Sequence, residues 1–101
     1  MKKYKIIMLP SAKRDLSGMI DYLSNFYPST AIKKYDKIIT KISLLQTTPN
    51  MCEEYPCAVS DFKYRKMVVE EYLVFYVVLE DTIEIHNIIN GKFDILKHLG
   101  S

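Results

Sequence analysis

The sequence contains no tryptophan and only three glycines, four prolines and two cysteines among 101 residues. So little glycine and proline excludes a collagen-like or low-complexity chain. No apolar run reaches the ~18 residues that a membrane-spanning helix needs, and the apolar stretch at residues 6–9 is too short for the core of a signal peptide. From these absences we expect a cytoplasmic protein that has no membrane as a partner.

Cysteine is too scarce to suggest a metal centre. Cys52 and Cys57 lie in one predicted loop with four residues between them, which is not a C-x-x-C pair, and no nearby histidine completes a zinc site. We expect two free thiols, since a local disulfide would form only under oxidising conditions. The sequence also lacks a glycine-rich phosphate loop and a Ser/His/Asp arrangement, so we expect no metal and no cofactor.

A large excess of either charge is absent as well. Fourteen Lys and Arg face twelve Asp and Glu, which gives a net charge of +2 and a pI near 8.5. A dedicated nucleic-acid-binding domain usually has a pI above ~9. Lys33, Lys37 and Lys41 fall on one side of a predicted helix, with Lys34 beside them. They form either a solvated face, which is the interpretation we prefer, or a basic strip that faces phosphates.

Apolar residues are plentiful, at 49% of the chain, which is enough for the core of one domain over residues 1–101. Val, Ile, Tyr and Phe concentrate between residues 63 and 94, a composition typical of strands. We predict three strands, Tyr64–Val69, residues 72–79 and Thr82–Asn90, joined by tight antiparallel hairpins. Neither connection carries the Gly or Asn that two-residue turns prefer.

The N-terminal half predicts a strand followed by two helices. Residues 4–9 alternate weakly and form the strand. Ser11 is a good N-cap for a helix whose apolar residues recur every three or four positions, and Pro28 ends this helix. Ser29 or Thr30 caps the second helix, which extends to about residue 45.

Residues 47–62 read as a loop because two prolines interrupt them, and residues 94–99 could form one helical turn. The predicted order is β-α-α-β-β-β. We therefore expect an α+β fold of two layers, in which one helical hairpin packs on one face of a four-stranded sheet.

Side-chain alternation divides the predicted sheet into two faces. One face is nearly all apolar, and we assign it to the helices; its central residues are Tyr72, Val74 and Tyr76. The other face has an apolar centre and a polar rim, and its residues are Tyr64, Lys66, Val68, Leu73, Phe75, Val77, Glu84, His86, Ile88 and Asn90. Because two helices cover only one face, we expect Leu73, Phe75 and Val77 to be exposed together, as in a protein-binding surface. The alternatives are a loop folded over this face, or homodimerisation.

Several short motifs follow one another along the whole chain. They are Pro10-Ser11-Ala12, Asp15-Leu16, Asp21-Tyr22, Tyr64-Arg65, Val68-Val69, Tyr72-Leu73-Val74-Phe75-Tyr76 and Ile88-Ile89-Asn90-Gly91-Lys92-Phe93-Asp94. In their order and spacing they resemble the RelE/ParE superfamily of bacterial toxins, the toxin halves of type II toxin–antitoxin modules. The resemblance implies one of two activities: RelE-like members cut mRNA, mostly on the ribosome, and ParE-like members poison DNA gyrase. It also implies a cognate antitoxin that wraps the toxin through an extended or helical segment.

This sequence lacks charged residues that RelE-like nucleases carry. Leu73 and Phe93 stand where such nucleases carry arginines, Asn90 stands where many members carry histidine, and the C-terminal tail has no match for the nuclease's tyrosine. These departures favour the ParE-like branch, a gyrase-directed growth inhibitor that is not an enzyme. The alternative is a metal-independent, ribosome-dependent mRNA endoribonuclease.

Only a few residues could carry RNA cleavage, which needs a base, a cation for the phosphate and an acid. The candidate catalytic residues are Arg65, Lys66 and His86, although Arg65 is predicted on the helix-facing side, and a lone strand histidine is more often structural. The candidate residues for binding a phosphate or the target are Lys63, Arg65 and Lys92. The candidate antitoxin-binding residues are Leu73, Phe75, Val77 and Ile88. The expected partners are the antitoxin and either gyrase or the ribosome with its mRNA, with the chain in a homodimer or in a heterotetramer with the antitoxin.

Overall fold

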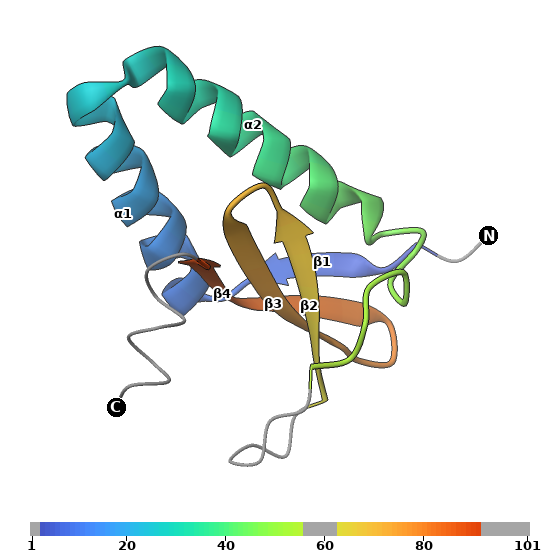
Figure 1. Cartoon of the computed structure of the whole chain (residues 1–101). Helices are drawn as coiled ribbons and strands as arrows, with labels where there is room; N and C mark the ends of the chain where they lie inside the picture. The colour runs from blue at the N-terminus through green and yellow to red at the C-terminus, as the bar shows by residue number, and fades with distance from the viewer. Residues whose placement is uncertain (1–2, 56–62, 92–101) are drawn as a thin grey trace.

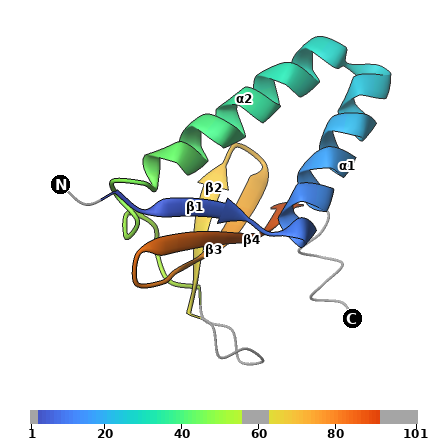
Figure 2. The same cartoon turned by 180° about the vertical axis from the view of Figure 1, so that it is seen from behind.

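The computed structural model describes residues 3–55 and 63–91, and the predicted helical turn at 94–99 lies outside them. The elements in chain order are β1 (Lys5–Met8), α1 (Pro10–Phe26), α2 (Pro28–Leu44), β2 (Tyr64–Val69), β3 (Tyr72–Val78) and β4 (Thr82–Asn90). This confirms the predicted order and the α+β class. Both helices lie on one side of the sheet (Figure 1), as the view from behind also shows (Figure 2).

Both helices begin at a proline. Pro10 and Pro28 occupy the first helical positions, where their fixed φ fits and no N–H is needed. The capping positions belong to Leu9 and Tyr27, and neither makes a side-chain cap. The predicted N-caps, Ser11 and Ser29 or Thr30, are therefore wrong, because each helix starts earlier than the nearest hydroxyl residue.

The sheet is mixed, with strand order β1-β4-β3-β2. The β2–β3–β4 meander is antiparallel as predicted, whereas β1 runs parallel to β4. Between β1 and β4 the chain passes through both helices and then through β2 and β3, which gives the long connection that such a parallel pair requires. The β2–β3 turn follows the predicted pairing of Val69 with Tyr72, and Glu70 adopts a φ of 55° there. That left-handed conformation is normally taken by glycine, so this turn depends on support from elsewhere.

A β-bulge divides β4 at His86. Tyr76 lies opposite Ile85, whereas the next residue of β3, Phe75, lies opposite Asn87, so His86 is the extra residue. Beyond the bulge, Val74 faces Ile88. The extra residue moves every later side chain of β4 to the face opposite from the one predicted.

The core lies between the helices and the near face of the sheet. Its buried members include Ala12, Leu16, Ile38, Ile42, Met67, Val69, Tyr72, Val74, Tyr76, Ile83, Ile85 and Ile88. Tyr76 has no exposed surface, and its hydroxyl donates a hydrogen bond to the carbonyl oxygen of Pro49 at 2.9 Å. This bond attaches the connection between α2 and β2 to the centre of the sheet.

The outer edge of β4 is shared between β1 and α1. β1 pairs only with the first part of β4, from Thr82 to Ile85. Past that point, the hydroxyl of Ser11 donates to the carbonyl oxygen of His86 at 2.6 Å. A carboxylate oxygen of Asp15 accepts from the backbone N–H of Ile88 at 3.0 Å. Side chains of α1 therefore satisfy backbone groups that a longer β1 would have paired.

Candidate functional site

The face of the sheet opposite the helices is less exposed than predicted. Leu73 and Val77 keep only 7% and 4% of their surface exposed, so the prediction that they lie open together with Phe75 is wrong. Phe75 is half-buried, and the ring of Tyr55 packs edge-on against it with 5.1 Å between centroids. The predicted alternative, a loop that folds over this face, describes the position of Tyr55.

Ile88 does not belong to this face. It lies opposite Val74 and is 4% exposed within the core cluster. The assignment of Ile88 to the antitoxin-binding face is wrong because the bulge at His86 reverses the parity of β4. The bulge also moves Asn90 to the helix-facing side of the sheet, where it lies opposite Tyr72.

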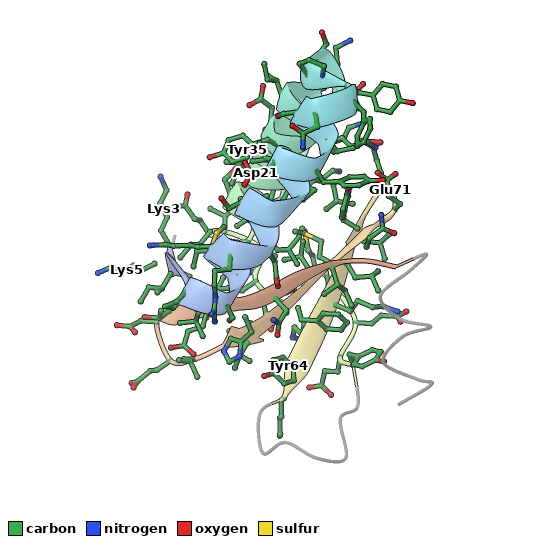
Figure 3. All side chains as sticks on the ribbon, turned by 90° about the vertical axis from the view of Figure 1, so that its left-hand side faces the viewer. Lys3, Lys5, Asp21, Tyr35, Tyr64 and Glu71 are labelled. Atoms are coloured by element: carbon green, nitrogen blue, oxygen red, sulfur yellow. The ribbon has the colours of Figure 1, made fainter. Side chains whose placement is uncertain are left out.

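His86 is held on both sides of its ring. The hydroxyl of Tyr64 lies 2.9 Å from Nδ1, and Oε1 of Glu84 lies 3.2 Å from Nε2. A neutral ring protonated at Nε2 satisfies both partners, because it donates to the carboxylate and accepts from the phenol. Figure 3 shows Tyr64 on the side of the sheet away from the helices. His86 is only 8% exposed, and both of its ring nitrogens have hydrogen-bond partners. It is therefore not a free acid or base. Side-chain alternation placed Tyr64 and His86 on the same predicted face, but it did not predict the hydrogen bond between them.

Arg65 is occupied by the segment that precedes β2. Its guanidinium donates to the carbonyl oxygen of Cys52 at 2.5 Å and lies 3.9 Å from the carboxylate of Glu54. As predicted, its position opposite Tyr76 puts it on the helix-facing side.

The next residue, Lys66, points to the opposite face by alternation, with its Nζ 5.4 Å from the centroid of the Tyr55 ring. Arg65, Lys66 and His86 therefore do not converge on one point. Lys63 is exposed, and Lys92 lies outside the described residues.

The lysines of α2 divide into two sets. The Nζ of Lys34 lies 2.5 Å from a carboxylate oxygen of Glu71 and 3.2 Å from one of Glu70. The Nζ of Lys37 lies 3.4 Å from the other carboxylate oxygen of Glu70. The hydrogen bond to Glu71 is the main reason that the pKa of Lys34 is raised. The hydrogen bond from Lys34 likewise lowers the pKa of Glu70.

Figure 3 shows Glu71 at the tip of the β2–β3 hairpin, beside the helices. These ion pairs connect α2 to the turn that contains Glu70. Lys33 and Lys41 are exposed, which fits the preferred interpretation of a solvated face.

The outer edge of β2 is paired along only half of its length. The N–H of Tyr55 donates to the carbonyl of Tyr64 at 2.6 Å, and the N–H of Lys66 donates to the carbonyl of Glu53 at 3.1 Å. Residues 53–55 thus act as a short additional strand inside the predicted loop. Among the described residues, no further backbone hydrogen bond forms along this edge toward Val68.

The helical hairpin carries exposed apolar side chains near its turn. Tyr22, Phe26, Tyr27 and Ile32 are each more than 60% exposed. The rings of Tyr22 and Phe26 lie 5.5 Å apart. These residues lie in or near the turn between the helices, at the end of the hairpin that is farthest from the sheet (Figure 1).

Within residues 3–55 and 63–91, neither of the two helices combines the length and the apolar character needed to cross a membrane. No three His, Cys, Asp or Glu side chains in that part of the chain gather in a group able to hold a metal ion.

Comparison with known proteins identifies the family. Residues 6–95 match the family model described as the ParE toxin of the type II toxin–antitoxin system parDE. No curated protein sequence matches the chain significantly. Among solved structures, the fold is similar to a chain of the chromosomal ParDE system from P. aeruginosa, with 21% identity, a TM-score of 0.73, and coverage of 87% of this chain and 96% of that one.

A second similar structure is a chain of the RelBE2 toxin–antitoxin complex from Mycobacterium tuberculosis, with 13% identity and a TM-score of 0.55. The match covers 87% of this chain and 98% of that one. The family match begins at Ile6, the second residue of β1, and extends beyond β4, so it includes both helices and all of the sheet except Lys5. The chain therefore belongs to the family of ParE toxins of type II toxin–antitoxin systems.

Proposed function

We propose that this ParE-family toxin inhibits growth by acting on DNA gyrase, without cutting RNA, in the bacterial cytoplasm. The observation that carries the non-nuclease mechanism is that the three candidate catalytic residues are dispersed and already have partners in the protein. Arg65 and Lys66 point to opposite faces, and both ring nitrogens of His86 have partners. Cleavage of RNA needs an acid, a base and a phosphate-binding cation around one scissile bond.

The position of Leu73 supports the same conclusion. Leu73 stands where the RelE-like resemblance places an arginine, and only 7% of its surface is exposed. No cation of β3 can therefore stabilise a phosphate from that position. The proposed action is instead a protein–protein contact with a large target.

We also propose a cognate antitoxin as the neutralising partner. The similar solved chains come from a ParDE system and from a RelBE2 toxin–antitoxin complex. Within this chain, the side of the sheet around Phe75 and the exposed residues of the helical hairpin offer apolar surface to such a partner. For the assembly we propose a heterotetramer with the antitoxin, with a homodimer of the toxin as the alternative.

Plasmid topology in a bacterial host tests the proposed target. Induction of the toxin alone should arrest growth and shift a reporter plasmid from supercoiled toward relaxed topoisomers, because gyrase introduces the negative supercoils. Mapping of mRNA ends in the same cells tests the RelE-like alternative. New mRNA ends at ribosome-bound codons, with unchanged topoisomers, would rule out the gyrase proposal.

A further inference from the structure

One side of α1 is open to solvent along most of its length. Ala12 and Leu16 place the inner side of the helix in the core. Because successive residues of a helix are rotated by about 100°, Arg14, Gly18 and Asp21 point the opposite way, and all three are exposed. Figure 3 shows α1 in front of α2, with Asp21 on α1. We call Arg14, Gly18 and Asp21 the outer face of α1.

Gly18 lies at the centre of this face, halfway along the helix. A glycine inside a helix costs stability relative to alanine, because its backbone loses more freedom on folding. A Cβ added at Gly18 would meet no atom within 4 Å beyond its own part of the helix. Packing inside the described chain therefore does not require this glycine. Its small size does allow the backbone of another helix to approach closely.

The side chains on the two sides of Gly18 are complementary. Arg14 lies four residues before it and Tyr22 four residues after it, with Asp21 next to Tyr22. If two copies of α1 cross antiparallel at Gly18, Arg14 of each copy lies against Asp21 and Tyr22 of the other. A single twofold axis then produces two ion pairs and two cation–π contacts.

This symmetry favours a second copy of the chain over a different protein as the partner. Both signs of charge lie on one face at similar distances from its centre, so the face is complementary to itself, as a twofold contact requires. Arg14 and Asp21 form no salt bridge with any described residue. Both charged groups are thus available to a partner.

Apolar residues lie at the two ends of the same contact. Tyr22 and Phe26 are 68% and 63% exposed, and their rings lie against each other. Phe26 is eight residues after Gly18, and the exposed Pro10 is eight residues before it. In the antiparallel pair, Phe26 of each copy therefore meets Pro10 of the other. These two apolar contacts would remove aromatic surface from water at the ends of the helix pair.

We propose that the free toxin forms a homodimer in which the outer faces of two α1 helices cross antiparallel at Gly18. One pair of 17-residue helices buries less than the ~1,600 Å² of a standard interface, so we expect a dissociation constant in the micromolar range. Phe75 lies on the opposite face of the sheet, so each copy can still bind an antitoxin there. The inference does not depend on the gyrase target.

Charge reversal tests the contact in sedimentation velocity runs of the purified toxin from ~1 to ~300 μM. Arg14→Glu leaves two acidic groups on each outer face, and Asp21→Arg leaves two basic groups. Each variant alone should dimerise at least ~10-fold more weakly than the wild type. An equal mixture of the two variants should restore the dimer, because every arginine then meets a carboxylate.

Gly18→Gln tests the crossing point. Glutamine is a better helix former than glycine and enters open space in the monomer, so the variant should melt no lower than the wild type. Its side chain would stand between the two backbones and should weaken the dimer at least ~10-fold. Ser24→Gln, at an exposed position of α1 outside the outer face, is the matched control and should dimerise like the wild type.

Three results would overturn the inference. They are a wild-type toxin that stays monomeric up to ~1 mM, a dimer that Gly18→Gln leaves unchanged, and charge-reversed variants that remain monomeric when mixed. A dimer retained by all of the variants would belong to another surface, such as the sheet face around Phe75. A monomeric toxin whose binding to the antitoxin is weakened by Gly18→Gln would assign the outer face to the antitoxin. The plasmid topology assay does not measure self-association, so its failure would reject the gyrase target alone.

Discussion

The hydroxyl of Tyr76, at the centre of the sheet, lies 2.9 Å from the carbonyl oxygen of Pro49, and both residues are buried. Tyr76→Phe would leave this carbonyl without a donor in the protein interior. We expect a loss of ~1–3 kcal/mol in the free energy of unfolding, which is the usual cost of a buried group that loses its partner. Urea denaturation of both proteins measures the difference. A loss below ~0.5 kcal/mol would mean that water replaces the phenol at Pro49.

Alkaline pH should weaken the fold through the same residue. Burial is the main cause that raises the pKa of Tyr76 above the ordinary value for tyrosine, and it also raises the pKa of Tyr72. The stabilisation is complete below ~10, the pKa of tyrosine in the unfolded chain, and decreases as pH rises toward the folded value. A tyrosine that is ionised only in the unfolded chain contributes a slope of at most ~1.4 kcal/mol per pH unit. Tyr76→Phe should therefore show a shallower decline than the wild type between pH ~10 and ~11.5. Identical slopes would contradict the burial of this phenol.

Acid should release the ion pairs between α2 and the β2–β3 turn. The hydrogen bond from Lys34 lowers the folded pKa of Glu70, so its stabilisation is present above ~4.3, the pKa in the unfolded chain, and is lost as pH falls through the folded value. Glu70→Gln should melt at a lower temperature than the wild type at pH ~7, and the difference should vanish at pH ~2. Glu53→Gln is the control, since no salt bridge of Glu53 occurs among the described residues. A difference for Glu70→Gln that persists at low pH would point to a cause other than charge.

Two neighbouring isoleucines test the bulge in β4. Ile88 lies in the core opposite Val74, while Ile89 is half-buried on the other face opposite Leu73. Ile88→Ala should cost ~2–5 kcal/mol through lost packing, and Ile89→Ala should cost clearly less. Thermal or urea unfolding of the two variants gives the comparison. Equal costs, or a larger one for Ile89, would place the bulge elsewhere.

A substitution of Phe75 tests whether the antitoxin binds the face of the sheet opposite the helices. It is half-buried against Tyr55, so an antitoxin seated there would complete the burial of an aromatic ring, and such rings are frequent hot spots worth at least ~2 kcal/mol. Phe75→Ser should weaken antitoxin binding at least ~30-fold in calorimetric titration and lower the melting temperature less than Ile88→Ala. Unchanged affinity together with a collapsed melting temperature would show that Phe75 is purely a core residue.

Much of this architecture could be predicted from local sequence signals. The pairing of Val69 with Tyr72 follows from alternation across a short turn, and Pro28 marks the junction of the helices. Each residue's face depends on the register of all earlier residues in the strand, however. One extra residue at His86 therefore moves Ile88 and Asn90 to the opposite face of the sheet, although their residue types do not indicate this change. Local patterns predict register only as far as the first irregularity.

The candidate site was less predictable because it depends on contacts between distant segments. The hydrogen bond from Arg65 to Cys52 spans thirteen positions, and that between Tyr64 and His86 spans twenty-two. Polar residues in a loop, such as Glu53 and Glu54, also give no periodic signal that they will extend a sheet edge. The sequence named Arg65 and His86 as candidates, but only the fold shows that both are already engaged.

Supercoiling of relaxed plasmid by purified gyrase and ATP tests whether the toxin inhibits gyrase without cutting RNA. The purified toxin should inhibit supercoiling at micromolar concentration, and Lys66→Ala with His86→Asn should inhibit as strongly as the wild type, because neither residue performs chemistry. Full supercoiling at that concentration, together with mRNA cleavage in a translating extract that this double substitution abolishes, would contradict it.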